Sequence, residues 1–256
     1  MAPASASRGM GQGGNVQQEA RKSLGALTGA RFLAALWVLV YHYTVEFRFA
    51  TVQEIAQYQD SRQSPLEVLI GQGHLAVDFF FILSGFILAY TYVTAEGAVR
   101  GGQWAFWVAR IARIYPVYLL GLLLGLGPFL LNEHNIHKVA LSAGAHLVML
   151  HAWLPGTLDL NQPSWSLSVE AFFYALFPLL LPLLARLRRR GLVLAFVCTW
   201  LGFGLLLAGL ALLGKLDGWG IQWWWRDFVR YNPVINLPDF IVGIALGLLF
   251  IRSDLG

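Results

Sequence analysis

The sequence predicts an all-α membrane protein, built as a polytopic helical bundle. Of its 256 residues, 57% are hydrophobic and only 12% are charged. A soluble domain of this composition would expose large apolar surfaces. The apolar residues also gather in segments close to the roughly 20 residues that a membrane-spanning helix needs. The single cysteine, Cys198, excludes an internal disulfide framework.

The amino-terminal residues 1–23 are rich in Ala, Ser, Gly and Gln and contain no aromatic residue, which predicts a disordered tail. Arg21 and Lys22 precede the first apolar segment, so the positive-inside rule places the tail in the cytoplasm. We expect the first segment to be an uncleaved anchor, because the chain after it reads VEFRFATVQEI and lacks the small residues of a cleavage site.

Six apolar segments are predicted to cross the membrane, at residues 27–47, 74–94, 114–131, 166–185, 191–213 and 234–252. A further segment at 139–153 would cover about 22 Å as a helix, less than the roughly 30 Å of the hydrocarbon core. If it crossed, the arginine cluster at 186–190 would lie outside, against the positive-inside rule. We therefore favour a re-entrant segment, with a seventh span as the alternative.

A re-entrant segment places residues 154–165 and 214–233 on the outer side of the membrane. The second stretch is rich in tryptophan, namely Trp219, Trp223, Trp224 and Trp225. An interfacial aromatic belt is the favoured interpretation of these side chains. A platform for stacking sugar rings is the alternative.

Arg31 and His42 lie eleven residues apart within the first span. At about 100° per residue, eleven steps return a helix to within roughly 20° of its starting direction, and the two residues are about 16 Å apart along the axis. Ionisable residues inside a membrane usually face a protein interior or a polar cavity. The pair therefore predicts a functional face on the first helix.

Five stretches occur in an order that resembles acyltransferase family 3. They are the Arg-x10-His pattern of the first span, GHLAVDFFFILSGFI (73–87), RIARIYPVY (110–118), NQPSWSLSVEAFFYALFPLLL (161–181) and NPVINLPDFIVGIALG (232–247). The resemblance implies a helical membrane enzyme that acylates glycans, lipids or secondary metabolites. Family members usually have more spans, so 24–256 is expected to be a membrane acyltransferase domain that lacks the last ones. Ala76 stands where the family often has glycine.

The resemblance also implies an acyl-CoA donor, with acetyl-CoA the expected form. His42 is the predicted catalytic base, because a neutral imidazole can take the proton of an attacking alcohol near pH 7. Its alternative role is packing against a neighbouring helix. Arg31 is expected to bind the donor phosphates, which would leave the thioester near His42. A snorkelling membrane anchor is the alternative for Arg31.

Arg110 and Arg113 stand three residues apart at the mouth of the predicted third span, so they share a helix face. The R-x-x-R of the resembling family suggests that they bind donor phosphates together with Arg31. The alternative is that, with Arg100, they only mark a cytoplasmic loop after the second span.

Glu170 is the predicted catalytic carboxylate, which could orient a histidine or bind an acceptor hydroxyl. Helix capping is its alternative role. Trp165 and Asp239, at positions that match family stretches, are the predicted substrate-binding residues. Ser84 and Gly85 are expected to let helices approach closely. We do not expect Ser84 to be a nucleophile, because the sequence shows no neighbouring base.

Two histidine patterns are interpreted without a catalytic role. His74 and Asp78 are separated by three residues, so they do not match the His-x4-Asp signature of lysophospholipid acyltransferases, and we favour edge positions for them. Four other histidines lack the spacing and companion ligands of a metal site, so no metal is predicted. They are His134, His137, His146 and His151.

The sequence thus predicts an integral enzyme of a bacterial inner membrane. Its expected partners are membrane lipid, acyl-CoA and a carbohydrate, lipid or metabolite acceptor. No nucleic acid is expected, because no basic run is interleaved with aromatic residues. The alternatives are a transporter or flippase, whose buried charges would line a path, and an inactive acyltransferase fragment. Inverted repeats, which would favour transport, are not visible between the two halves.

Overall fold

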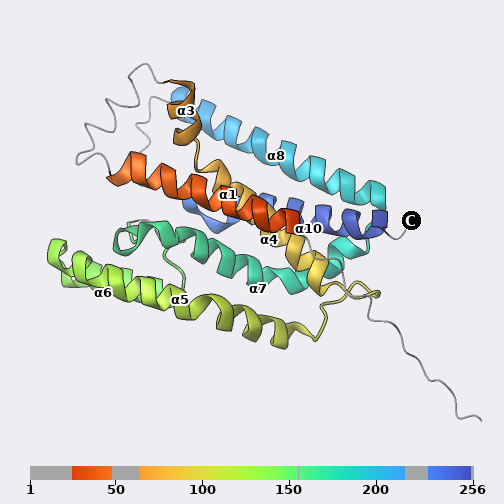
Figure 1. Cartoon of the computed structure of the whole chain (residues 1–256), viewed down its shortest axis with the longest axis horizontal. Coiled ribbons are helices and arrows are strands. Elements are labelled where there is room, and N and C mark those ends of the chain that lie inside the picture. Colours follow the sequence, from red (N-terminus) through yellow and green to blue (C-terminus); the bar gives the residue numbers. More distant parts are fainter. Residues whose placement is uncertain (1–24, 48–63, 155, 217–229, 255–256) are drawn as a thin grey trace, which may run out of the picture.

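The computed structural model describes residues 25–47, 64–154, 156–216 and 230–254. Long helices pack side by side in these ranges (Figure 1). Six of them are long and apolar enough to cross a membrane. The only β-type pairing in the described ranges is an isolated bridge between Val93 and Val99. The predicted all-α membrane fold is confirmed, whereas the predicted tail and the tryptophan-rich stretch at 219–225 lie outside the described residues.

The elements follow one another as helices and short helical turns. In chain order they are α1 (Gly25–Tyr41), η1 (His42–Phe47), α3 (Pro65–Gly71), α4 (Leu75–Tyr92), α5 (Gln103–Asn132), α6 (Ile136–Leu147), η2 (Leu158–Leu160), η3 (Gln162–Ser164), α7 (Trp165–Ala185), α8 (Arg189–Leu216) and α10 (Pro233–Asp254). The predicted spans correspond to α1, α4, α5, α7, α8 and α10. Their bounds agree within a few residues, except at the start of α5 and at the end of the first span, where α1 ends at Tyr41 and η1 continues to Phe47.

Helix α5 begins at Gln103, well before the predicted start at 114. Gly101 and Gly102 have φ of 76° and 84°, a left-handed conformation that glycine adopts readily, and they mark the helix start. The third span was predicted to begin at 114, with Arg110 and Arg113 at its mouth. The helix itself begins earlier and carries both arginines within it.

The short segment after α5 folds back along that helix. Asn135 caps α6 by accepting hydrogen bonds from the backbone N–H groups of His137 and Lys138. At the other end of α6, the Tyr115 hydroxyl donates to the carbonyl of Leu147 at 2.9 Å. Figure 1 shows α5 and α7 running in opposite directions, which a full crossing by α6 would not allow. The arrangement agrees with the re-entrant interpretation.

The centre of the bundle is the close packing of α4 against α10. A Cβ atom on Gly85 would lie 2.3 Å from the carbonyl oxygen of Phe240, and one on Gly243 would lie 2.0 Å from that of Ile82. Glycine therefore lets the two backbones touch, as predicted for Gly85. Helix α7 packs across the pair through stacked Phe173 and Phe240 rings, whose centroids are 4.6 Å apart.

Helix α1 lies at the edge of the bundle. Among its residues only Ala34 is buried, and the Trp37 indole donates to the carbonyl of Leu69 in α3 at 2.9 Å. Because α1 does not pack tightly across the inner helices, a cavity remains between it and the rest of the bundle.

Candidate active site

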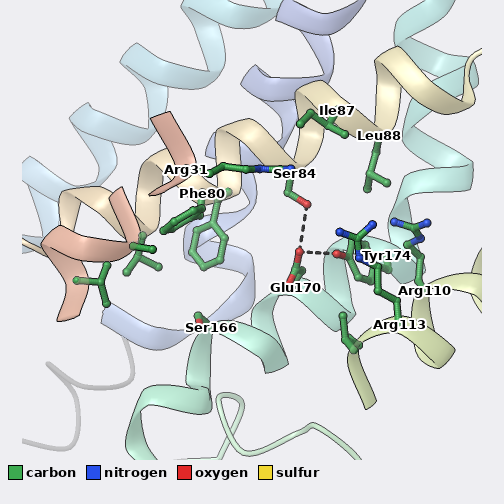
Figure 2. A pocket seen from close by; sticks show the side chains of 15 residues that line it. Arg31, Phe80, Ser84, Ile87, Leu88, Arg110, Arg113, Ser166, Glu170 and Tyr174 are labelled. Carbon is green, nitrogen blue, oxygen red and sulfur yellow. Dashed lines mark hydrogen bonds between the residues drawn. The ribbon is translucent and has the colours of Figure 1, made fainter. Parts of the chain in front are cut away.

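A cavity of about 500 Å³ lies between α1, α4, α5 and α7 (Figure 2). Its wall includes Arg31 from α1, Arg110 and Arg113 from α5, and Glu170 from α7. The fold thus brings together four of the seven predicted site residues from three helices. We call this space the arginine cavity.

The arginines of this cavity are held in different ways. Arg110 donates from Nη2 to the Tyr92 hydroxyl at 2.7 Å, and its guanidinium lies 5.2 Å from the Tyr92 ring centroid and 5.8 Å from that of Phe106. Its Nε is buried and has no hydrogen-bond partner among the described residues. Arg113 is exposed. The Arg31 side chain extends past Phe80 toward Ser84 (Figure 2). Guanidinium groups converging from two helices suit an anion such as phosphate.

Two hydroxyl groups hold the Glu170 carboxylate. Ser84 Oγ donates to Glu170 Oε1 at 3.3 Å, and the Tyr174 hydroxyl donates to the same oxygen (Figure 2). Sequence reasoning missed both partners. Tyr174 could have been found, because it stands four residues after Glu170 on one helix face. Ser84 could not, because 86 residues separate it from Glu170.

His42 lies beside a smaller, adjoining cavity of about 30 Å³, which we call the histidine cavity. Val38 and Val77 line both this space and the arginine cavity. Because Arg31 and Val38 face one cavity, and Val38 and His42 face the next, the predicted functional face of α1 is turned toward the interior of the bundle.

Trp165 also lines the histidine cavity. Its ring contacts Phe81 edge-on, with centroids 5.9 Å apart, and Tyr231 at 4.8 Å. The start of α7 thus places an aromatic face beside His42. Glu170 lies five residues further along α7, about 8 Å by the helix rise. The structure therefore puts Glu170 with the arginines and His42 with Trp165, and does not place both in one cavity.

Asp239 lines a third cavity, of about 590 Å³, between α4, α8 and α10. Asp78, Asn236 and Trp200 face the same space. His74 and Arg230 line both this cavity and the histidine cavity. The histidine cavity is therefore a neighbour of both the arginine cavity and the third cavity, with which it shares wall residues.

A buried histidine pair stabilises the re-entrant segment. The His146 and His151 rings stack with centroids 3.9 Å apart, and both side chains are fully buried. His151 Nε2 lies 3.0 Å from the carbonyl oxygen of Ser164. Burial, with His146 as the second cause, lowers the pKa of His151 to about 4. A group of three or more His, Cys, Asp or Glu that could hold a metal is not found in the described ranges.

The chain matches known proteins along most of its length. The family model described as an acyltransferase domain, acyltransferase family 3, matches residues 24–254. Acyltransferase MdmB from Streptomyces mycarofaciens is 29% identical over 239 residues, which is 88% of this chain and 57% of that protein. An uncharacterized protein from Haemophilus influenzae is 31% identical over 184 residues, 67% of this chain and 74% of that protein.

A protein from Staphylococcus aureus with a provisional O-acetyltransferase name is 24% identical over 239 residues, 88% of this chain and 34% of that protein. The chain therefore spans little more than half of the Streptomyces protein and about a third of the staphylococcal one. No solved structure is significantly similar to the chain.

Proposed function

The chain belongs to acyltransferase family 3, and we propose that it transfers an acyl group from acyl-CoA to a hydroxyl group of a carbohydrate, lipid or secondary metabolite. The observation that carries the proposal is the convergence of Arg31, Arg110 and Arg113 with Glu170 on one cavity between helices that are long and apolar enough to cross a membrane. Acetyl is the proposed acyl group, supported by the O-acetyltransferase name of the staphylococcal relative.

The arginine cavity is the proposed donor site. A guanidinium can pair two phosphate oxygens at once, and CoA carries several such groups. The buried Nε of Arg110, which lacks a partner among the described residues, is a donor that fits such an anion. Phosphate bound at Arg31 would leave about 16 Å of α1 up to His42, comparable to the reach of an extended pantetheine arm. The thioester would then lie deep in the bundle.

The histidine cavity and the third cavity form the proposed acceptor side. His42 is positioned to take the proton of the acceptor hydroxyl, and Trp165 offers a face for an apolar or ring surface beside it. Asp239 and Asp78 would accept hydrogen bonds from further hydroxyl groups of the acceptor. We place the chain in a bacterial inner membrane with its amino terminus in the cytoplasm. The donor would then enter from the cytoplasmic end of the bundle.

Label transfer in membranes tests the proposal. Membranes that contain the chain are incubated with acetyl-CoA radiolabelled in the acetyl group, with membranes lacking it as the control. We expect label in a product that is separable from CoA. Label that accumulates inside vesicles as unchanged acetyl-CoA would instead identify a transporter. Absence of both transfer and binding of acetyl-CoA would contradict the proposed donor.

A further inference from the structure

Ser84, Glu170 and Tyr174 form a hydrogen-bonded series inside the arginine cavity (Figure 2). Ser84 lies well inside α4, and its hydroxyl donates to Glu170 Oε1 at 3.3 Å. Tyr174, one turn after Glu170, donates to the same oxygen. The Ser84 hydroxyl therefore has a carboxylate beside it that a second hydroxyl holds in place.

This arrangement meets the geometric requirements of an activated nucleophile. Such a site needs a hydroxyl within hydrogen-bond reach of a base, and the base oriented by a third group. Ser84, Glu170 and Tyr174 occupy these positions in turn.

The separation of Glu170 from His42 gives each base its own surroundings. Glu170 shares its cavity with the arginines, and His42 shares the next one with Trp165. A single direct transfer would need only one base at one carbonyl. Two bases in adjoining cavities fit two successive proton transfers, one at the donor and one at the acceptor.

We propose that Ser84 carries the acyl group as a covalent ester between donor and acceptor. The proposal rests on the proposed function, since it takes the acyl group from acyl-CoA. In the first half-reaction, Ser84 Oγ attacks the thioester carbonyl while Glu170 takes the serine proton. The carbon–sulfur bond then breaks, and the proton passes from Glu170 to the departing sulfur, which gives acyl-Ser84 and free CoA thiol.

In the second half-reaction, the acceptor hydroxyl attacks the carbonyl of acyl-Ser84 while His42 takes its proton. The bond between the carbonyl carbon and the serine oxygen breaks, and this proton passes to the serine oxygen. The products are the acylated acceptor and the original Ser84 hydroxyl. The serine ester thus retains the acyl group after CoA leaves the arginine side and before the acceptor attacks from the histidine side.

Isotope exchange tests the first half-reaction without any acceptor. The chain in lipid nanodiscs is mixed with acetyl-CoA and radiolabelled free CoA, and label entering acetyl-CoA is measured. A covalent acyl-Ser84 makes this exchange possible, because the first half-reaction is reversible. We expect exchange in the wild type and in His42→Ala. Glu170→Gln should lower its rate by roughly 100-fold, the usual contribution of a general base, and Ser84→Ala should abolish it.

Ser253 supplies a matched control, because its hydroxyl donates to the carbonyl of Phe250 and it lines none of the three cavities. Ser253→Ala should exchange at the wild-type rate. Acid-quenched protein should carry one acetyl group on the peptide that contains Ser84, and more of it in His42→Ala, whose second half-reaction is blocked. Ser84→Cys should carry the group as a thioester, which keeps the proposal testable if Ser84→Ala fails to fold.

The two proposals fail in different ways. A wild-type chain that binds acetyl-CoA and transfers its acetyl group, yet shows no exchange and no acetyl on Ser84, overturns the covalent carrier and leaves the proposed function standing. Exchange that persists in Ser84→Ala also overturns the carrier. A wild-type chain that does not bind acetyl-CoA overturns both proposals.

Discussion

The side chains proposed to act on the donor and on the acceptor lie in adjoining cavities. Glu170 accepts hydrogen bonds from Ser84 and Tyr174 in the arginine cavity, and His42 lies in the neighbouring one. A role for Glu170 in orienting His42, one of the two suggested by the sequence, therefore has no support from their placement. The donor and acceptor roles of the arginines and of His42 lead to separate predictions.

Replacing His42 should stop transfer without weakening donor binding. His42→Ala is expected to lower the rate of acyl transfer about 100-fold to 10,000-fold, because a general base acts mainly in the transition state. The dissociation constant for acetyl-CoA should stay close to that of the wild type, as measured by calorimetry in detergent. His137→Ala, at an exposed position of α6, is the control. Wild-type transfer by His42→Ala would remove His42 from the reaction.

Replacing Arg31 should weaken donor binding according to the charge that remains. We expect Arg31→Ala to raise the dissociation constant for acetyl-CoA about 10-fold to 100-fold, the range of a charge-assisted hydrogen bond. Arg31→Lys should raise it less, because an ammonium keeps the charge but cannot pair two phosphate oxygens. Arg188→Ala, in the exposed turn after α7, should bind normally. Unchanged affinity in both Arg31 variants would make Arg31 a membrane anchor.

At the scale of helices, glycine contacts and a buried histidine pair determine how the elements meet. Gly85 and Gly243 bring α4 and α10 into backbone contact, which places Ser84 opposite Glu170 on α7. The stacked His146 and His151 connect the end of α6 to the start of α7. Both features are open to tests of stability.

A methyl group at the α4–α10 contact should destabilise the bundle. Gly243→Ala would place its Cβ 2.0 Å from the carbonyl oxygen of Ile82, so the two helices must separate. We expect a loss of about 1–3 kcal/mol, the usual cost of overpacking, measured as a lower Tm in detergent. Gly127→Ala in α5, which meets no atom within 4 Å, should not lower the Tm. Equal stability of both variants would contradict the close packing.

Acid should destabilise the re-entrant segment. The pKa of His151 is lowered from 6.5 to about 4 by burial, so between these values the unfolded chain binds a proton that the folded chain does not. This contribution to stability is present above pH 6.5 and is lost as the pH falls toward 4. We expect the Tm to fall over this window, and less steeply in His151→Asn. An identical pH dependence in the variant would contradict the assignment.

For the whole molecule, the direction of the helices decides which side of the membrane each cavity reaches. If α6 returns without crossing and the amino terminus is cytoplasmic, Asp159 lies outside and Arg189 lies in the cytoplasm. Asp159 is a suitable labelling position because it is exposed, whereas the nearby Thr157 is buried.

Cysteine labelling tests this topology. In a Cys198→Ser background, Asp159→Cys should react with an impermeant thiol reagent from outside intact cells, and Arg189→Cys should react only after the cells are opened. Because α5 and α7 run in opposite directions (Figure 1), the reverse pattern would mean that the whole bundle is inserted the other way round, with the amino terminus outside. The acceptor would then have to be met from the cytoplasm, because the start of α7 and the histidine cavity beside it would face that side.

Most of the architecture followed from the sequence, because apolar length and the position of arginines are local properties. Residues 166–185, for example, predicted α7 almost to its ends, and 27–47 predicted α1 together with η1. The regular turn of a helix also predicted that Arg31 in α1 and His42 at the start of η1 face the same side, and they line adjoining cavities. The start of α5 was predicted too late, because a helix can carry arginines inside a bundle when a polar cavity receives them.

The tertiary structure decided which side chains meet. Residues far apart in sequence come together only through packing, so the bond from Ser84 to Glu170 across 86 residues had no sequence signal. For that reason the sequence showed no base near Ser84, and the structure does. The separation of His42 from Glu170 likewise depends on which residues of α7 lie beside the end of the first helix. That alignment is set by the packing of the two helices and not by either helix alone.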